Sequence, residues 1–320
     1  MAGGQERILR NRIRSVQATK KITRAMELIA ASRIVKAQQR VQAAVPYSEQ
    51  ITQVVRNLAA AGASSDSPLL AGREQEGTVA YVIIAADRGL CGGYNSGVLR
   101  AAEGEIKDAA LAGKDHLTIP VGRKAESYLR FRGYKVGQAF AGFSDSPGYG
   151  DAREVADHVM DLYGEGQVDR VELVYTRFVS AGNQEVVNRP LVPLERELIA
   201  VTAPSAPATS NGPSADYEYE PSPSAILDTL VPRYVEARTY AALLNAAASE
   251  HAFRQRAMKA ATDNADELIK TLSRIMNRAR QDSITTEIME IVGGAEALGA
   301  DDKDEALTPH PLEILDVQGV

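Results

Sequence analysis

The chain has 320 residues, of which 44% are hydrophobic and 24% charged, with a formal net charge of −6. This composition is typical of a globular protein of one or two domains, and the acidic balance argues against a general nucleic-acid-binding protein. The single cysteine, Cys91, excludes an internal disulfide framework and a cysteine-based zinc site. There is no apolar run of about 18 residues and no apolar signal-peptide core, so we predict a cytoplasmic location.

Residues 1–60 are predicted to form one long helix. Apolar or small residues recur there every three or four positions, which is typical of a coiled-coil seam. Pro46 predicts a kink, because proline removes a backbone donor and crowds the preceding turn. The seam consists of Ile34, Ala37, Val41, Ala44, Ser48, Ile51, Val55 and Leu58. The rhythm is imperfect before residue 34, at Leu9, Ile13, Val16, Ile22, Met26 and Ile29.

Residues 77–195 alternate predicted strands with predicted helices. This order favours an α/β domain with a mostly parallel sheet. Strands are expected at 77–89, 116–122, 134–140, 168–178 and 184–194, and helices at 96–111, 123–133 and 151–166.

The remaining segments are a loop, a second helical region and a tail. Residues 196–222 are rich in Pro, Ser and Ala, which predicts a mobile loop. Residues 223–298 are predicted to be helical, and residues 299–320 form an acidic tail that we expect to be poorly ordered. The second helical region carries a 4-3-4-3-4 spacing of apolar residues at Ala261, Ala265, Leu268, Leu272, Ile275 and Ala279.

The lengths of the two helical segments constrain the architecture. A helix of about 57 residues is about 85 Å long and one of about 75 residues is about 110 Å long, which exceeds the size of a compact domain. Neither helix can be buried within the α/β domain. Because the two helices run in opposite chain directions with a domain between them, we predict an antiparallel coiled coil that projects from that domain. Apolar surface at its far end then needs a partner.

Five sequence motifs occur in order along the chain. They are KKITRAMELIAASRI (20–34), DRGLCGGYN (87–95), EPSPSAILDTLVPRYVEA (220–237), MKAATDNADELIKTLSRIMNRARQDSIT (258–285) and ITTEIMEIVGGAEA (284–297). Together they resemble the gamma subunit of the bacterial F-type ATP synthase, over residues 1–298. The chain departs from that pattern in its acidic tail, at Pro232 and in the enlarged Pro/Ser loop at 202–216.

The resemblance implies an α/β fold with a long antiparallel coiled coil. The N- and C-terminal helices would form a shaft, with a central Rossmann-like α/β domain at its base. The implied divisions are the N-terminal shaft helix 1–60, the α/β domain 77–195, the loop 196–222, the C-terminal shaft helix 223–298 and the tail 299–320.

The resemblance also implies a function. One copy of the chain would turn inside a hexamer of alternating alpha and beta subunits, with its base on the c-ring and in contact with the epsilon subunit. It would hold no cofactor or metal and perform no catalysis itself, while coupling proton-driven rotation to ATP synthesis or hydrolysis at the beta subunits. It would lie at the cytoplasmic face of the bacterial cell membrane, which it would reach only through the c-ring.

By resemblance, four groups of residues are expected to contact partners. The beta-subunit contacts would be Lys20, Lys21, Arg24, Met26, Arg33, Arg254, Gln255, Arg274, Arg278, Arg280, Gln281, Thr285, Glu287 and Glu290. The apolar bearing at the shaft tip would be Ile284, Ile288, Ile291 and Val292. The contacts to the c-ring or epsilon would be Tyr217, Glu218, Tyr219 and Glu220, and the subunit-contact loop would comprise Arg88, Gly89, Leu90 and Gly92.

Other functions are possible for the same features. Residues 7–40 hold ten basic residues against one acid, Glu27, which suits a solvated helix face, a nucleic-acid-binding coiled coil or a shaft turning past acidic loops. The glycine loop 87–95 follows a strand and precedes a helix, as a phosphate-binding loop would, but it lacks both GxxxxGK[ST] and GxGxxG. The missing fingerprint argues against a dinucleotide-dependent enzyme. The four histidines form no ligand-spaced pair, so we predict no zinc site.

Overall fold

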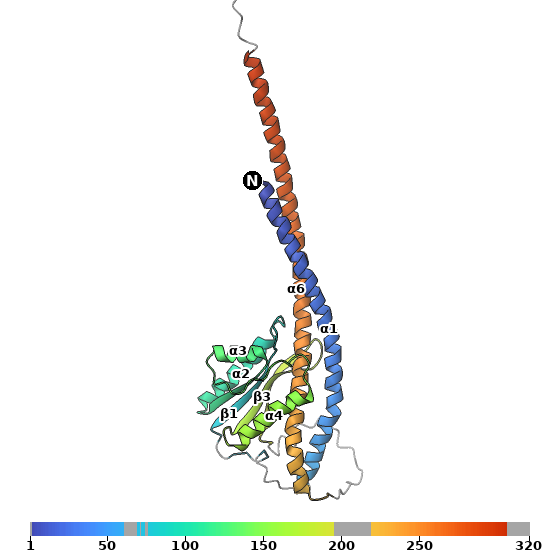
Figure 1. Cartoon of the computed structure of the whole chain (residues 1–320), viewed down its shortest axis with the longest axis vertical. Helices are drawn as coiled ribbons and strands as arrows, with labels where there is room; N and C mark the ends of the chain where they lie inside the picture. The colour runs from blue at the N-terminus through green and yellow to red at the C-terminus, as the bar shows by residue number, and fades with distance from the viewer. Residues whose placement is uncertain (1, 61–68, 71, 74–75, 195–218, 306–320) are drawn as a thin grey trace, which may run out of the picture. The chain divides into compact units, whose positions relative to one another are not determined.

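The computed structural model describes residues 2–60, 69–70, 72–73, 76–194 and 219–305 (Figure 1). The chain divides into two compact units. One unit comprises residues 1–22 and 261–320, and the other comprises residues 23–260. Two long helices, α1 (Ala2–Ala60) and α6 (Pro223–Glu305), each contribute to both units.

A four-stranded sheet lies at the centre of the larger unit. Its strands are β1 (Thr78–Ile84), β2 (Asp115–Val121), β3 (Arg170–Phe178) and β4 (Gln184–Val192), in the order β2-β1-β3-β4. The strand β1 is parallel to both β2 and β3, whereas β4 is antiparallel to β3. The mixed α/β domain and its mostly parallel sheet were predicted from the alternation of strands and helices.

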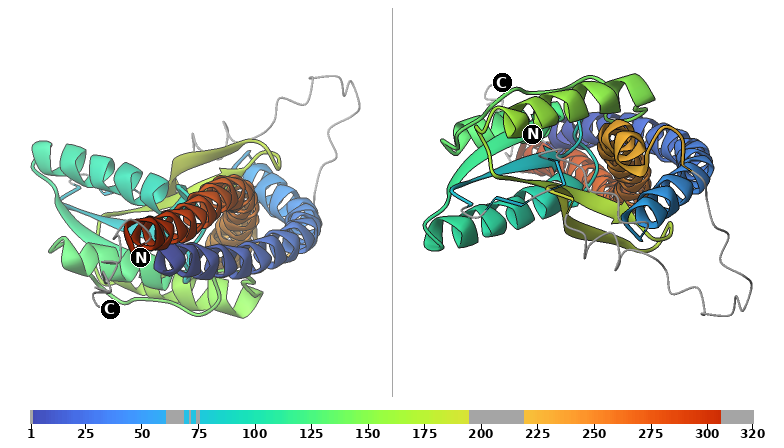
Figure 2. Two further views of the ribbon diagram at one scale, coloured as in Figure 1. Left: turned by 90° about the horizontal axis from the view of Figure 1, so that it is seen from above. Right: turned by 90° about the horizontal axis from the view of Figure 1, so that it is seen from below.

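Helices cover both faces of the sheet (Figure 2). They are α2 (Tyr94–Leu111), α3 (Arg123–Phe131) and α4 (Tyr149–Gly164). Side chains along β1 alternate between the two faces, as a strand requires. Val79, Tyr81 and Ile83 pack with α2 and α3, whereas Val82 and Ile84 lie in a core shared with α4, α1 and α6.

The predicted strand at 134–140 does not form. Only isolated bridges join this segment to β2, at Thr118–Val136 and Val121–Phe140. Phe140 N donates to the carbonyl oxygen of Pro120 at 2.9 Å and Gly122 N donates to the carbonyl oxygen of Phe140 at 2.7 Å. Pro120 itself has no N–H to offer to the segment between the two bridges. Gly137 further weakens the extended segment, so a continuous ladder is replaced by single contacts.

The turn between β2 and α3 depends on Gly122. Its φ is +100°, and a Cβ atom at this position would lie 2.1 Å from the carbonyl oxygen of Ala85. Both facts exclude any other residue without a backbone shift. This turn brings the beginning of α3 against the loop that follows β1.

The helix α6 ends later than expected, whereas α1 ends at residue 60 as predicted. The helix α6 continues to Glu305, so residues 299–305 are helical and the predicted tail boundary at 299 is wrong. Ala, Lys and Glu in this stretch favour a helix and outweigh the glycine at 299. The rest of the tail, 306–320, lies outside the described residues, as does most of the predicted loop at 196–222. Pro46 and Pro232 both lie within helices that continue past them.

The apolar series predicted for α1 is buried or half-buried from residue 34 onward. Ile34, Ala37, Ile51, Val55 and Leu58 are buried, and the three positions between them are half-buried. Ile51, Val55 and Leu58 belong to the main core with α6.

The N-terminal part of that series was partly wrong. Ile13 is buried as predicted, but Ile22 and Ile29 are 61% and 54% exposed, and the buried positions between residues 22 and 30 are Thr23, Glu27 and Ala30. The spacing of three and four residues is therefore regular, but polar side chains occupy some of its positions. A search for apolar residues alone could not find it.

The stripe predicted on α6 shifts in the same way. Ala265 and Leu272 are buried as expected, whereas Leu268 and Ile275 are 41% and 49% exposed. Ile269 and Met276 are half-buried in their place. Both series have period 3.5 and share every second member, so the sequence pattern could not choose between them.

Candidate functional site

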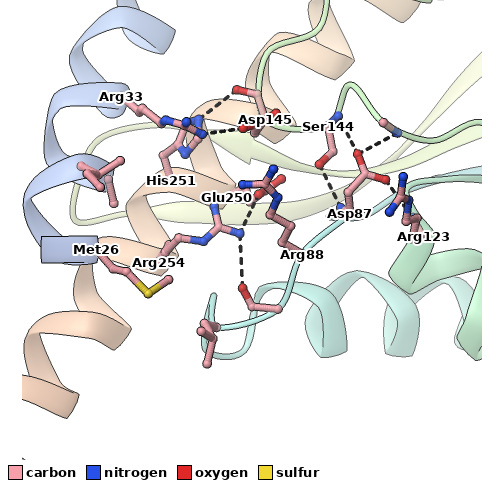
Figure 3. Close-up of a pocket in the computed structure, with 15 residues that line it drawn as sticks. Met26, Arg33, Asp87, Arg88, Arg123, Ser144, Asp145, Glu250, His251 and Arg254 are labelled. Carbon is pink, nitrogen blue, oxygen red and sulfur yellow. Dashed lines mark hydrogen bonds and ion pairs between the residues drawn. The ribbon is translucent and has the colours of Figure 1, made fainter. Parts of the chain in front are cut away.

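A cavity of about 400 Å³ opens in the larger unit between α1, α6 and the loop after β1 (Figure 3). Its floor is polar and charged, while Met26, Ile29 and Leu90 provide apolar side chains. The lining residues are Met26, Ile29, Ala30, Arg33, Asp87, Arg88, Gly89, Leu90, Arg123, Gly142, Ser144, Asp145, Glu250, His251 and Arg254.

Asp87 organises the loops on one side of this cavity. Its carboxylate accepts backbone N–H groups from Arg123, Gly142 and Ser144 at 3.1, 2.9 and 3.1 Å, and its own N–H donates to Ser144 Oγ at 2.9 Å. Burial by itself would raise the pKa of Asp87, but these backbone donors outweigh it and lower the pKa. The charged carboxylate therefore joins three separate segments of the α/β domain.

The glycine loop makes a tight turn beside Asp87. Leu90 and Gly92 have φ values of 62° and 55°, and Leu90 is 63% exposed at the mouth of the cavity. Cys91 is buried beneath them, and this burial raises the pKa of its thiol. The side chain is packed as a small core residue rather than presented as a nucleophile.

A buried ion pair on α6 forms part of the floor. Arg254 Nη2 lies 2.7 Å from Glu250 Oε1, and the Glu250 side chain is 1% exposed. Arg254 also donates to the carbonyl oxygen of Gly89 at 3.4 Å. Burial raises the pKa of Glu250, and Arg254 offsets part of this effect. The pair thus joins α6 to the glycine loop.

The α1 side of the site meets the segment before α4. Arg33 forms an ion pair with Asp145, and Arg40 Nη1 donates to Ser146 Oγ at 2.6 Å. His251 Nε2 lies 3.0 Å from the carbonyl oxygen of Asp145. Burial lowers the pKa of His251, which favours a neutral ring with Nε2 as the donor.

The cavity brings together several of the predicted contact residues. Met26, Arg33, Arg254 and the loop residues 88–90 all line it, although they come from three distant parts of the sequence. Arg33 and Arg254 have acidic partners within the chain. Gln255 is half-buried on α6, and Gly92 does not line the cavity.

Other predicted contacts lie elsewhere. Lys20 forms an ion pair with Asp266 in the smaller unit, Lys21 is exposed, and Arg24 pairs with Glu27 at 2.9 Å. The remaining predicted contacts on α6 are all exposed: Arg274, Arg278, Arg280, Gln281, Thr285, Glu287 and Glu290. The expected bearing residues Ile284, Ile288, Ile291 and Val292 are exposed in the isolated chain.

The predicted contacts before α6 are only partly described. Tyr219 is half-buried and packs against the main core, and Glu220 is exposed. Tyr217 and Glu218 lie outside the described residues.

Sequence reasoning missed the acidic and histidine residues that hold the site together. Asp87 lay at the edge of a recognised loop, but Ser144, Asp145 and His251 follow no local pattern. Their roles arise from contacts across more than fifty residues of sequence, whereas Glu250 pairs with Arg254 four residues further along α6. A charged residue within the otherwise alanine-rich run 241–252 was a usable signal for Glu250, because a buried charge requires a partner.

Within the described ranges, no group of three or more His, Cys, Asp or Glu residues could hold a metal ion. No helix in the described part of the chain combines the length and apolarity needed to cross a membrane.

A mixed α/β domain combined with two terminal helices of 59 and 83 residues places the chain among long-helix stalk proteins. Residues 5–298 match the family model described as ATP synthase. The "ATP synthase gamma chain" of Parafrankia sp. (strain EAN1pec) is 50% identical over 301 residues, which are 93% of this chain and 99% of the relative. The protein of the same name from Frankia casuarinae is 51% identical with the same coverage.

The fold is also similar to that of a chain in the cryo-EM structure of the Euglena gracilis mitochondrial ATP synthase, OSCP/F1/c-ring, in rotational state 3. The TM-score is 0.65 at 16% identity, and the match covers 99% of this chain and 100% of that one. This chain belongs to the gamma-subunit family of F-type ATP synthases, the family of the central stalk.

Proposed function

We propose that the chain is the non-catalytic rotor shaft of an F-type ATP synthase, present in one copy per complex. It would couple proton-driven rotation of the c-ring to ATP synthesis or hydrolysis at the beta subunits. The observation that carries this proposal is the family match over residues 5–298, on a chain with two helices of more than fifty residues. The partners would be the alpha–beta hexamer, the epsilon subunit and the c-ring, at the cytoplasmic face of the membrane.

The shaft itself would be an antiparallel coiled coil of α1 and α6, with the α/β domain, Rossmann-like in type, at its base. Regular spacing of buried and half-buried positions supports this pairing, from Ile13 to Leu58 on α1 and from Met258 to Ala279 on α6. The ion pair of Lys20 with Asp266 supports it within the smaller unit. The corresponding divisions are 1–60, 77–195, 196–222 and a C-terminal shaft helix that begins at 223 and continues past the predicted end at 298 to Glu305.

Conformational coupling would proceed through the asymmetry of the shaft. Each beta subunit would meet a different face at a given angle, and each contact would favour one conformation of that subunit, so that rotation shifts the populations of open and closed sites. Exposed ion pairs contribute only about 0–1 kcal/mol each, so a ring of them can guide a turning shaft without stopping it. The basic face of α1 and the exposed polar face of α6 provide such charges.

The exposed isoleucines of α6 would form the bearing at the shaft tip. Ile284, Ile288 and Ile291 have no cover within the described chain, and their side chains are 48%, 54% and 71% exposed. An apolar sleeve contributed by the hexamer would bury them. Because hydrophobic contact is non-directional, it does not impose one angle on the shaft.

The remaining groups would contact the base partners. Tyr217, Glu218, Tyr219 and Glu220 would meet the c-ring or epsilon, and the loop with Arg88, Gly89, Leu90 and Gly92 would meet a neighbouring subunit. The two α6 residues Arg254 and Gln255 remain beta-subunit contacts in this proposal. For Arg254 the partner would have to compete with the buried Glu250.

Reconstitution tests the proposal directly. The full chain is mixed with alpha and beta subunits of the same organism and ATP, and both the assembled species and its ATPase rate are measured. We expect a complex with one copy of this chain per hexamer, whose turnover depends on the chain. A well-folded chain that neither assembles nor changes the ATPase rate would contradict the rotor function. Salt-sensitive retention on nucleic acid would then support the alternative function, a basic coiled coil that binds nucleic acid.

A further inference from the structure

The segment 142–149, here called the clamp segment, lies between the sheet and both long helices in the larger unit. Two arginines of α1 reach it: Arg33 pairs with the carboxylate of Asp145, and Arg40 donates to Ser146 Oγ at 2.6 Å. These arginines are seven residues apart, so they project from the same face of α1, two turns from each other. The clamp segment therefore holds α1 at two points along its axis.

The same segment also binds α6. His251 Nε2 lies 3.0 Å from the carbonyl oxygen of Asp145. Asp145 therefore contacts α1 through its carboxylate and α6 through its backbone carbonyl. At the other end of the segment, the Tyr149 hydroxyl donates to Glu236 Oε2 at 2.6 Å, and Glu236 is 3% exposed. Arg233 lies 3.0 Å from the same carboxylate and compensates its charge.

The sheet holds the clamp segment from the third side. Asp87, which follows β1, accepts the N–H groups of Gly142 and Ser144. Its lowered pKa keeps the carboxylate charged across the neutral range. Figure 3 shows Asp87, Ser144, Asp145, His251 and Arg33 succeeding one another from the sheet towards α1.

The two helices differ in how else they are attached to the sheet. The helix α6 is bound to β3 directly, because Ser249 Oγ donates to the Thr176 carbonyl at 3.0 Å and Asn245 Oδ1 accepts from Phe178 N at 3.2 Å. For α1, the contacts of Ile51, Val55 and Leu58 with the core are apolar. Apolar contacts resist separation but specify an angle weakly, whereas charged hydrogen bonds are directional.

From these contacts we infer that the clamp segment is a torque-transmitting element, in which Asp145 and Ser146 are positioning residues that fix the angle of α1 relative to the α/β domain and α6. The inference rests on the proposed rotor function. When torque enters through the α/β domain, the apolar core alone would let α1 slip, and the paired arginines oppose that slip.

The test uses the full reconstituted ATP synthase and measures ATP hydrolysis and ATP-driven proton pumping in the same vesicles. Asp145→Asn removes the charge that pairs with Arg33 but retains the backbone carbonyl that faces His251. We expect hydrolysis within twofold of the unmodified complex and at least a twofold fall in protons pumped per ATP hydrolysed. The matched control is Asp157→Asn, which removes an exposed α4 carboxylate paired with Arg153 and should leave the ratio unchanged.

A double-mutant cycle separates the clamp from direct partner contacts of Arg33. If Arg33 acts through Asp145, the double variant Arg33→Gln/Asp145→Asn should pump no worse than Asp145→Asn alone. Lys36→Gln, on the same stretch of α1, is the control for losing a basic charge. A double variant that is clearly worse than Asp145→Asn would assign the main role of Arg33 to a partner and overturn its part in the clamp.

The outcomes distinguish the two levels of the proposal. If the unmodified chain does not support ATPase activity and pumping, the rotor function itself fails. If it does, but Asp145→Asn retains the pumping ratio of Asp157→Asn, or loses hydrolysis and pumping in equal proportion, the clamp is overturned. If Asp145→Asn fails to assemble, Ser146→Ala and Arg40→Gln replace it in the test, because each removes only the contact between Arg40 and Ser146. The number of protons pumped per ATP hydrolysed then decides in the same way.

Discussion

Two parts of the single helix α6 behave differently. In the larger unit, between Tyr234 and Ala252, side chains on all sides of the helix are buried or half-buried, including the run Ala246, Ala247 and Ala248. In the smaller unit, beyond Ala261, burial is confined to one stripe with Ala265 and Leu272. A helix that is apolar on all sides is a core element, whereas one with a single stripe is a surface or paired element. One continuous helix can therefore act as core in one unit and as an exposed arm in another.

The largest expected contrast concerns ion pairs in the two parts. Arg254→Met should cost about 3–5 kcal/mol of unfolding free energy, because Glu250 loses its partner in a buried site. Lys20→Met, which breaks the half-exposed pair with Asp266, should cost about 0–1 kcal/mol. Denaturant unfolding of the full chain measures both. Equal losses would show that the two parts of α6 are equally shielded from solvent.

A second contrast uses apolar truncations. Leu243→Ala removes a buried side chain from the main core and should cost about 2–5 kcal/mol. Ile288→Ala, at a 54% exposed position, should leave the stability of the isolated chain within about 0.5 kcal/mol. If Ile288 belongs to a bearing, its truncation should instead weaken function in the assembled complex. A large loss of stability from Ile288→Ala would reveal intramolecular cover that the structure lacks.

A smaller contrast comes from one substitution made twice. Ala248→Leu inserts a large side chain where the alanine is fully buried and should destabilise the chain by about 1–3 kcal/mol. Ala295→Leu makes the same change at an exposed position and should be close to neutral. Melting temperatures of the two variants provide the comparison, and a neutral Ala248→Leu would indicate room around α6 that its burial does not suggest.

The smallest expected effect is a pH dependence at His251. Burial lowers its folded pKa below the unfolded value of about 6.5, so the unfolded chain binds more protons in this range. The stability that this group contributes is complete above about pH 6.5 and is lost as the pH falls through the folded pKa. His251→Gln should therefore flatten the fall in unfolding free energy on acidification, measured against the unmodified chain.

Neighbouring charged groups also shift the pKa of His251 and contribute to the pH dependence of stability. Asp145 raises the pKa of His251, while Arg33 and Arg254 lower it. Burial raises the pKa of Glu250, so its contribution has the opposite sign and is lost as the pH rises through its folded pKa. His158, whose pKa burial also lowers, is present in both proteins and cancels in the difference. An unchanged profile in His251→Gln would mean that this ring is protonated equally in both states.

Sequence alone was sufficient for the elements and for the family. Alternating strand and helix patterns predicted the sheet and its three covering helices, and the five motifs indicated the gamma-subunit family that the comparisons then showed. These features are local or depend on residue order, so a single sequence contains them. The prediction failed at 134–140, because Pro120 on the neighbouring strand decides whether a ladder can form there.

Tertiary structure decided which face of each long helix is buried and which residues form the site. A period of 3.5 residues permits two overlapping stripes, and only packing selected Ile269 and Met276 over Leu268 and Ile275. The cluster of Asp87, Asp145 and His251 likewise has no local signature. Asp145 lies 58 positions after Asp87, and His251 lies 106 positions after Asp145. Local periodicity determines what a segment can become, whereas directional contacts between distant segments exist only once the chain has folded.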